Sequence, residues 1–286
     1  MEYVHPEALV STEWLAAHLN DANLRLLDAT FTLPGVSPTG PELYVQRHIP
    51  GAIYYDIEEI RDTANPLPHM LPDAKTFAAM MGHLGVGNGH KIVVYDSAGL
   101  ASAPRAWWTL RAFGHRDVAI LNGGLAKWRA EGRPVSADVP KFPPAKFAAQ
   151  FDKKRVRNKH QLLANLKSQR EQVVDARSAG RFAGTSPEPR AGLRGGHIPG
   201  SCSLPSDQLS DPKTRTVLPP EALAAKLFAA GLDPSKPAVS SCGSGVTACV
   251  IAFGMYLLGW PEPAIYDGSW SEWGLPGDTP VATGPA

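Results

Sequence analysis

The 286-residue chain is poor in cysteine and carries almost no net charge. Its three cysteines, Cys202, Cys242 and Cys249, cannot all pair within one chain, and none of them belongs to a Cys-x-x-Cys pattern. A disulfide framework and a zinc site are therefore not expected. The formal net charge is +1, and charged residues make up 19% of the chain against 43% hydrophobic residues. This balance is typical of a soluble globular protein and predicts no nucleic-acid partner.

Sequence signals for membranes and bound cofactors are also missing. No stretch approaches the roughly 18 uninterrupted apolar residues of a membrane span, so we expect no membrane partner. The segment Met1–Pro6 lacks a basic region followed by an apolar one, and by default this predicts a cytoplasmic protein. No phosphate-binding glycine pattern and no cluster of metal ligands occurs, so the sequence predicts neither an organic cofactor nor a metal.

The sequence contains one unit that occurs twice. Residues 48–52 read His-Ile-Pro-Gly-Ala, and residues 197–201 read His-Ile-Pro-Gly-Ser. Two further pairs of segments keep the same order, namely 25–29 with 172–176 and 122–128 with 267–273. Between these landmarks, the apolar run that ends in Asp96 corresponds to the run that ends in Cys242. Only the second copy therefore carries a thiol at this position.

Each copy alternates β-like apolar runs with amphipathic helical runs, which predicts an α/β fold with a mostly parallel sheet in each unit. The expected strands are Leu26–Leu27, Ala52–Tyr55, Ile92–Tyr95, Val118–Leu121, Val173–Val174, Ser201–Leu204, Ala238–Ser241 and Ala264–Tyr266. The expected helices are Ser11–Leu19, Asp73–Leu84, Pro104–Phe113, Pro220–Ala230 and Val246–Leu258.

The length corresponds to about two domains. We expect an N-terminal domain over residues 1–135, a proline-rich and basic linker over 136–157, and a second domain over 158–286. The prolines suit an extended strap. The basic triplet Lys153–Arg155 is interpreted as a solvated part of the linker without a binding function.

The candidate nucleophile is Cys242. A β-like run ends at this residue and turns through Gly243, Ser244 and Gly245 into an apolar helical pattern. Successive backbone N–H groups of such a turn, with the positive end of the following helix, stabilise an anion such as a thiolate. The expected anion loop consists of Gly243, Ser244, Gly245, Val246, Thr247 and Ala248. Taken alone, this short run would fit a buried core cysteine equally well.

The repeated unit together with this loop resembles the tandem-domain rhodanese superfamily, in which a domain without a catalytic cysteine precedes an active one. The resemblance covers nearly the whole chain. Within that superfamily, the loop Cys-Gly-Ser-Gly-Val-Thr is similar to that of the 3-mercaptopyruvate sulfurtransferases. Thiosulfate-using members carry basic side chains just after the cysteine, where this chain has Gly243 and Ser244.

Two arginines in a Gly/Pro-rich loop, Arg181 and Arg190, are candidate substrate-binding residues. A guanidinium fork suits the carboxylate and carbonyl of a 2-oxo acid. From the residues alone, the favoured interpretation is that they are solvated loop residues, with Glu188 as a partner. The resemblance implies that they hold the substrate, and it gives no such role to the nearby Arg194.

The resemblance also implies a relay in which His69 links Ser244 to an acidic residue. The acidic position is Glu58, where other members have aspartate, so the side chain is longer here. His48 and His197 open the same turn in both copies and are interpreted as structural, and Asp28 and Asp175 as scaffold hydrogen-bond acceptors in equivalent places. Cys249, about two helical turns after Cys242, and Cys202 are expected in the core.

The resemblance implies a sulfurtransferase that moves the sulfur of 3-mercaptopyruvate through a Cys242 persulfide to a small thiol, cyanide or a thioredoxin-type protein. Three alternatives remain. A thiosulfate sulfurtransferase differs only in its substrate, and a rhodanese-like binding module would need no chemistry at all. A cysteine phosphatase would need an arginine where this chain has Ala248.

Overall fold

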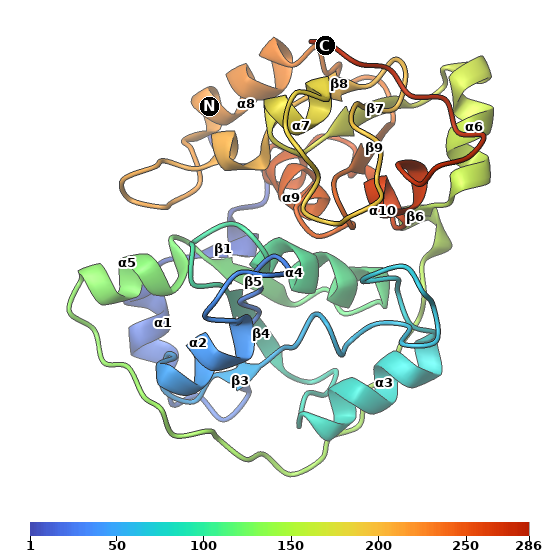
Figure 1. The fold of residues 1–286 in the computed structure, drawn as a ribbon. Helices are drawn as coiled ribbons and strands as arrows, with labels where there is room; N and C mark the ends of the chain where they lie inside the picture. Colours follow the sequence, from blue (N-terminus) through green and yellow to red (C-terminus); the bar gives the residue numbers. More distant parts are fainter. Residues whose placement is uncertain (286) are drawn as a thin grey trace.

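The computed structural model describes residues 1–285 and contains two α/β domains, stacked one above the other in Figure 1. Each domain has a five-stranded parallel sheet, with strand orders β1-β5-β4-β2-β3 and β6-β10-β9-β7-β8. The two orders are the same once each domain is counted from its own first strand. The predicted α/β class and the repeated unit are therefore confirmed.

The first sheet consists of β1 (Leu9–Val10), β2 (Leu24–Asp28), β3 (Ile53–Tyr54), β4 (Lys91–Tyr95) and β5 (Val118–Leu121). The second consists of β6 (Val156–Arg157), β7 (Gln172–Asp175), β8 (Cys202–Ser203), β9 (Ala238–Ser241) and β10 (Ala264–Tyr266). The central strands β4 and β9 are buried on both faces, which explains their nearly continuous run of small and apolar residues.

Helices cover the sheets, and three 3₁₀ turns occur at Pro6–Ala8, Lys153–Arg155 and Ser206–Leu209. The helices of the first domain are α1 (Thr12–His18), α2 (Gly40–Gln46), α3 (Ala74–His83), α4 (Ala103–Ala112) and α5 (Gly124–Ala130). Those of the second are α6 (Lys159–Ser168), α7 (Ala179–Ala183), α8 (Pro220–Ala229), α9 (Ala248–Leu257) and α10 (Ser269–Trp273). The elements that we predicted end within two residues of their expected positions. Within residues 1–285, no helix is long and apolar enough to cross a membrane.

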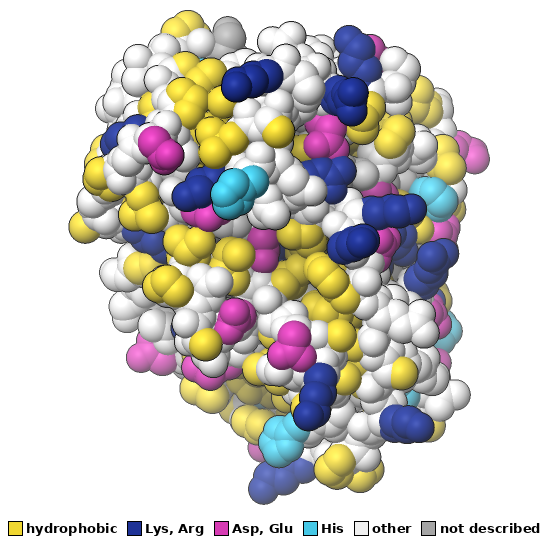
Figure 2. All heavy atoms as spheres, turned by 90° about the vertical axis from the view of Figure 1, so that its right-hand side faces the viewer, with side chains coloured by type: hydrophobic (Ala, Val, Ile, Leu, Met, Phe, Trp, Pro, Cys, Tyr) yellow, Lys and Arg dark blue, Asp and Glu magenta, His cyan; other side chains and the backbone are white. Residues whose placement is uncertain are grey.

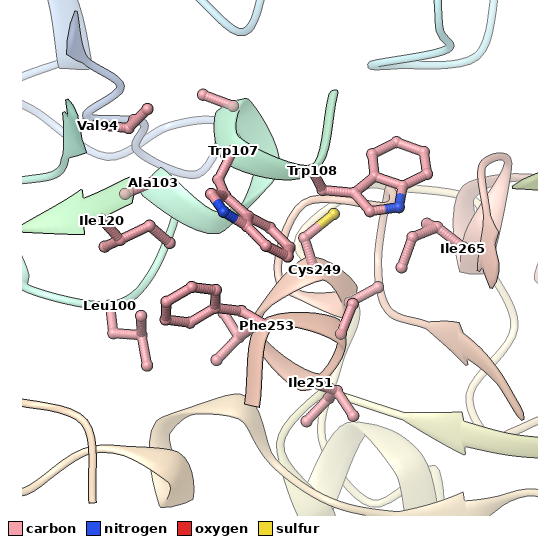
Figure 3. Packing of buried hydrophobic residues seen from close by; sticks show 14 of the residues in the cluster. Val94, Leu100, Ala103, Trp107, Trp108, Ile120, Cys249, Ile251, Phe253 and Ile265 are labelled. Carbon is pink, nitrogen blue, oxygen red and sulfur yellow. The ribbon is translucent and has the colours of Figure 1, made fainter. Parts of the chain in front are cut away.

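The domains share one hydrophobic cluster, which passes through the contact between α4 and α9. Figure 3 shows Trp107 and Trp108 of α4 facing Cys249 and Phe253 of α9. The rings of Trp107 and Phe253 meet edge to face, with their centroids 5.0 Å apart. Because α9 directly follows the Cys242 loop, this packing holds the loop against the first domain.

The segment between the domains runs along the first domain as an extended strap (Figure 1). Its Phe147 is buried edge to face against Phe77 of α3, and the Ala145 N–H group donates to the Gly82 carbonyl oxygen over 2.9 Å. Farther on, Arg155 pairs with Glu262 of the second domain. The strap is therefore packed on the first domain before the chain enters the second sheet at β6.

The two equivalent aspartates, Asp28 and Asp175, have different partners. Asp28 accepts hydrogen bonds from the Thr30 N–H and hydroxyl groups, at 2.9 and 2.5 Å, whereas Asp175 pairs with the Arg177 guanidinium at 2.6 Å. Burial without a cation raises the pKa of Asp28 to about 6. Asp28 therefore binds its proton more tightly in the folded state than in the unfolded state.

The free energy of unfolding should consequently fall as the pH rises through about 6, by up to about 3 kcal/mol from this group. We expect Asp28→Asn, which keeps an acceptor oxygen, to remove this dependence and to stabilise the protein at neutral pH. Urea unfolding followed at a series of pH values measures both effects. Asp175→Asn is the matched control, and it should destabilise the protein at neutral pH because it leaves Arg177 buried and less well paired. Equal effects of the two substitutions would contradict the prediction.

Candidate active site

Cys242 directly follows the central strand β9, at the carboxyl edge of the second sheet, where open α/β sheets bind their ligands. Cys242 is 2% exposed. The Cys242 N–H group donates to Ser269 Oγ over 3.2 Å, and its carbonyl oxygen accepts from the Trp270 N–H group over 2.9 Å. The start of α10 therefore fixes the backbone of the candidate nucleophile.

The loop after Cys242 presents unused hydrogen-bond donors. Within the described part of the chain, no backbone N–H group from Gly243 to Ala248 donates to a protein acceptor. Gly245 has φ +77°, a left-handed conformation that favours glycine. The loop then leads into the first turn of α9, so its N–H groups and the helix N-terminus form a cradle for an anion.

In the first domain, the equivalent loop forms such a cradle, and a carboxylate of the same domain occupies it. The Asp96 carboxylate accepts hydrogen bonds from backbone N–H groups at distances of 2.7 to 2.9 Å, and the donors are Ala98, Gly99, Ala101, Ser102 and Ala103. Asp96 itself is 1% exposed. The first domain therefore satisfies its own loop with a carboxylate, whereas the second domain leaves its loop free around a thiol.

Residues of both domains line a cavity of about 320 Å³ at Cys242. The first domain contributes Phe31, Leu33, Ala101 and Ser102. The second contributes Arg177, Arg181 and Arg190 together with five residues of the loop, namely Cys242, Gly243, Ser244, Val246 and Thr247. The cavity thus combines an apolar wall, a cysteine and several guanidinium groups, which suits a small anionic substrate.

The structure brings together the three residues expected to form a relay. His69 Nδ1 lies 2.9 Å from Ser244 Oγ, within hydrogen-bond geometry. His69 Nε2 lies 3.1 Å from Glu58 Oε1, but this pair lacks the angle of a hydrogen bond. The contact with His69 is the main influence that lowers the pKa of Glu58, whose side chain is half-exposed. Glutamate at this position therefore reaches the histidine, although the alignment is incomplete.

The two predicted substrate arginines differ in how they are bound. Arg181 Nη2 pairs with Glu188 Oε2 at 2.6 Å. Arg190 lines the same cavity, and within residues 1–285 it has no hydrogen-bond or ion-pair partner. Burial lowers the pKa of Arg190, while the charges of Glu58 and Cys242 raise it. Arg190 is therefore the guanidinium that is free to take a ligand carboxylate.

Sequence reasoning missed one arginine of the cavity. Arg177 is 1% exposed, pairs with Asp175 at 2.6 Å and with Glu188 at 2.7 Å, and stacks over the Trp270 ring at 4.1 Å. A signal was available, because Arg177 follows β7 by two residues at the carboxyl edge of the sheet. Arg194 instead donates to the backbone of Trp273 and to Thr279, outside the cavity.

The histidines of the two repeated turns and the other two cysteines lie inside the protein or at the edge of its core, and Cys202 is only partly buried. His48 Nδ1 lies 2.8 Å from the Tyr44 carbonyl oxygen, and His197 Nδ1 lies 2.9 Å from that of Phe182. Cys249 donates to the Gly245 carbonyl oxygen over 3.3 Å, and burial raises the pKa of its thiol. Burial also raises the pKa of Cys202, to about 11. None of these four side chains lines the Cys242 cavity.

On the face shown in Figure 2, basic and acidic side chains are interspersed with apolar ones. Within residues 1–285, no group of three or more His, Cys, Asp or Glu residues is arranged to hold a metal ion.

Comparisons with known proteins agree with this arrangement. A model of the rhodanese-like domain matches residues 11–131 and 158–275. The 3-mercaptopyruvate sulfurtransferase of Homo sapiens is 45% identical over 93% of this chain and 91% of its own length. The thiosulfate sulfurtransferase of Cricetulus griseus is 45% identical over 97% and 96%. The crystal structure of SseA from Escherichia coli, a 3-mercaptopyruvate sulfotransferase, matches with a TM-score of 0.84 and 39% identity over 93% of this chain and 99% of that one. The chain therefore belongs to the rhodanese family and carries two copies of the family's domain in tandem.

Proposed function

We propose that the protein transfers the sulfur of 3-mercaptopyruvate through a persulfide on Cys242. The observation that carries this proposal is the cradle of uncharged N–H groups beside the cysteine, next to Arg190, since neither the cradle nor this guanidinium has a protein partner within residues 1–285. A neutral cradle stabilises a thiolate and then a persulfide anion without a metal or a cofactor. The Arg190 guanidinium matches the substrate carboxylate.

In the first half-reaction, the Cys242 thiolate attacks the substrate sulfur. The sulfur–sulfur bond forms as the carbon–sulfur bond breaks, and the electron pair remains on carbon as the enolate of pyruvate. The proton of the substrate thiol is transferred to this carbon, which leaves pyruvate and the Cys242 persulfide anion. Ser244 and His69 are placed to carry that proton, because Ser244 lines the cavity and its Oγ lies 2.9 Å from His69 Nδ1 behind it.

In the second half-reaction, a nucleophilic acceptor attacks the outer sulfur and restores the Cys242 thiolate. A small thiol, cyanide or a thioredoxin-type protein can each supply this nucleophile. Cyanide would leave as thiocyanate, and a thiol would leave as its own persulfide. The catalytic cysteine alone carries the sulfur between the two steps.

Thiosulfate is the alternative substrate, and relatives with both names match this chain at the same identity. The loop favours 3-mercaptopyruvate, because Gly243 and Ser244 supply no cation for a dianionic donor. Gly243 is also packed against Arg181, since a Cβ atom at this position would lie 2.9 Å from Arg181 Nη2. A basic side chain at residue 243 would therefore displace a guanidinium that is already in place.

The decisive measurement is the ratio of kcat/KM for 3-mercaptopyruvate to that for thiosulfate, with cyanide as the common acceptor. We expect 3-mercaptopyruvate to be preferred at least about ten-fold. Arg190→Leu should raise KM for 3-mercaptopyruvate by about 10- to 100-fold, because a charged hydrogen bond to the carboxylate is lost. Arg194→Leu is the matched control, since Arg194 lies outside the cavity, and it should leave KM unchanged.

A preference for thiosulfate would overturn the substrate assignment but leave Cys242 as the nucleophile. If neither donor were turned over, the binding-module alternative would be favoured. A normal KM in the Arg190→Leu variant would remove Arg190 from the substrate site.

A further inference from the structure

Two equivalent hydrogen bonds, one donated by each domain, join the domains. The Leu71 N–H group of the first domain donates to Asp267 Oδ2 of the second over 2.7 Å. The Val217 N–H group of the second domain donates to Asn122 Oδ1 of the first over 2.8 Å. Asn122 and Asp267 begin the equivalent segments 122–128 and 267–273 of the repeat. Each domain thus binds a loop of the other at the same place.

The equivalence extends to the backbone of the two bound loops. His69 and Arg215, two residues before the donating N–H groups, are both left-handed, with φ 59° and 62°. This conformation is strained for long side chains and persists only where the surroundings enforce it. A Cβ atom added to Gly99 would lie 2.6 Å from the Arg215 carbonyl oxygen, so loop and partner are in direct contact.

The contact beside Cys242 contains an additional ion pair. Arg105, the third residue of α4, is 3% exposed and donates to the His69 carbonyl oxygen, to Gly245 O at 3.2 Å and to Asp267 Oδ1 at 3.1 Å. The third residue of α9 is Val250, and the other contact has the neutral Asn122 in place of Asp267. The contact at Asn122 joins the domains without any charged group. Burying the charges of Arg105 and Asp267 costs free energy, and joining the domains does not require it.

We propose that Arg105, held by Asp267, is a positioning residue for the relay of Ser244 and His69. One guanidinium binds the strained residue His69 and the nucleophile loop at Gly245 together. It thereby sets the distance between His69 Nδ1 and Ser244 Oγ. In this role Arg105 acts through His69 and Gly245 and not directly on the substrate or on Cys242. The inference rests on the proposed sulfur transfer, because the relay has a catalytic purpose only there.

The test is the double variant Arg105→Met/Asp267→Asn, which removes both charges and keeps an acceptor oxygen for the Leu71 N–H group. Buried ion pairs replaced in this way often leave stability unchanged, so the variant is expected to fold. We expect kcat for 3-mercaptopyruvate to fall at least about ten-fold with KM nearly unchanged, because proton transfer is disturbed and carboxylate binding is not. Arg105→Lys, which can reach fewer of the three acceptors, should give an intermediate kcat.

Arg111→Met is the matched control. Arg111 also lies on α4 and pairs with Glu262 of the second domain at 2.6 Å, away from the Cys242 cavity. Its loss should lower stability slightly and leave kcat unchanged. A fall in kcat equal to that of the double variant would show that any weakened domain contact has this effect, and would overturn the positioning role.

A second readout does not depend on turnover. The ring nitrogen chemical shifts of His69 in labelled protein, assigned with a His69→Gln variant, report the hydrogen bond to Ser244. They should change in the double variant and stay fixed in Arg111→Met.

Unchanged shifts and an unchanged kcat in the double variant would overturn the inference while sulfur transfer by the wild type stands. If the wild type transferred no sulfur, the proposed function would fail, and the shifts would still decide whether Arg105 positions His69. If the double variant did not fold, Arg105→Lys and Asp267→Asn carry the same test.

Discussion

Replacing Cys242 with serine is expected to abolish sulfur transfer, lowering kcat by at least about a thousand-fold with every acceptor. A hydroxyl in the same cradle is neither ionised nor able to hold a transferable sulfur. The folded state should be retained, because serine is smaller and the Cys242 backbone is held by Ser269 and Trp270. The measurement is single-turnover pyruvate release, together with the mass of the protein after incubation with donor. The wild type should gain one sulfur atom, and the variant should gain none.

Cys249→Ser and Cys202→Ser are the controls for this experiment. Both thiols lie outside the cavity, and burial raises the pKa of each. Both variants should still load sulfur. Sulfur retained on Cys242→Ser would place the carrier on one of these two cysteines and would contradict the proposed mechanism.

Asp96→Ala is expected to cause the largest loss of stability of the changes considered, about 3–5 kcal/mol. The substitution leaves five backbone N–H groups of the loop without their acceptor in a buried site. Water can replace only part of what the carboxylate supplies. Equilibrium unfolding in urea measures the loss.

Asp96→Asn provides the graded control. The amide keeps one acceptor oxygen and loses the other, so its stability should lie between those of the wild type and the alanine variant. Chloride or sulfate should restore part of the stability of Asp96→Ala, because either anion can occupy the emptied cradle. Full stability of the alanine variant without added anion would contradict the account of this loop.

Much of the fold and part of the site could be predicted from the sequence, for local reasons. The apolar runs Val118–Leu121, Ala238–Ser241 and Ala264–Tyr266 are strands with those bounds, because buried parallel strands are continuous apolar segments between turns. The placement of Cys242 at the end of such a run put it at the carboxyl edge of the sheet. Local pattern was sufficient for each of these conclusions.

Other elements were missed although their signals were present. The helices α2 and α6 begin with capping boxes, Thr39 with Glu42 and Asn158 with Gln161, which can be recognised in the sequence. The short helix α10 is different, because its sequence carried no such signal. It begins at Ser269 in a left-handed conformation, and hydrophobic periodicity does not indicate such a start.

The contacts across the domain boundary could not be read from local pattern at all. Arg105 looks like an ordinary residue of an amphipathic helix, and Asp267 like a loop residue. Their pairing over 3.1 Å depends on how the two domains dock. The position of His69 beside Ser244 likewise came from resemblance to a family and not from spacing, since the two residues lie in different domains.

In the proposed mechanism, the burial of Cys242 limits which molecules could receive its sulfur. With 2% of the residue exposed at a cavity of about 320 Å³, the outer sulfur of a persulfide would lie below the molecular surface. Cyanide and small thiols can diffuse into a space of that size. A protein acceptor would have to insert its thiol on a projecting loop into this cavity, whose wall includes Phe31 and Leu33, and a thiol on a flat protein surface would not reach the sulfur. The depth of the cysteine therefore selects acceptors by shape before any chemical preference applies.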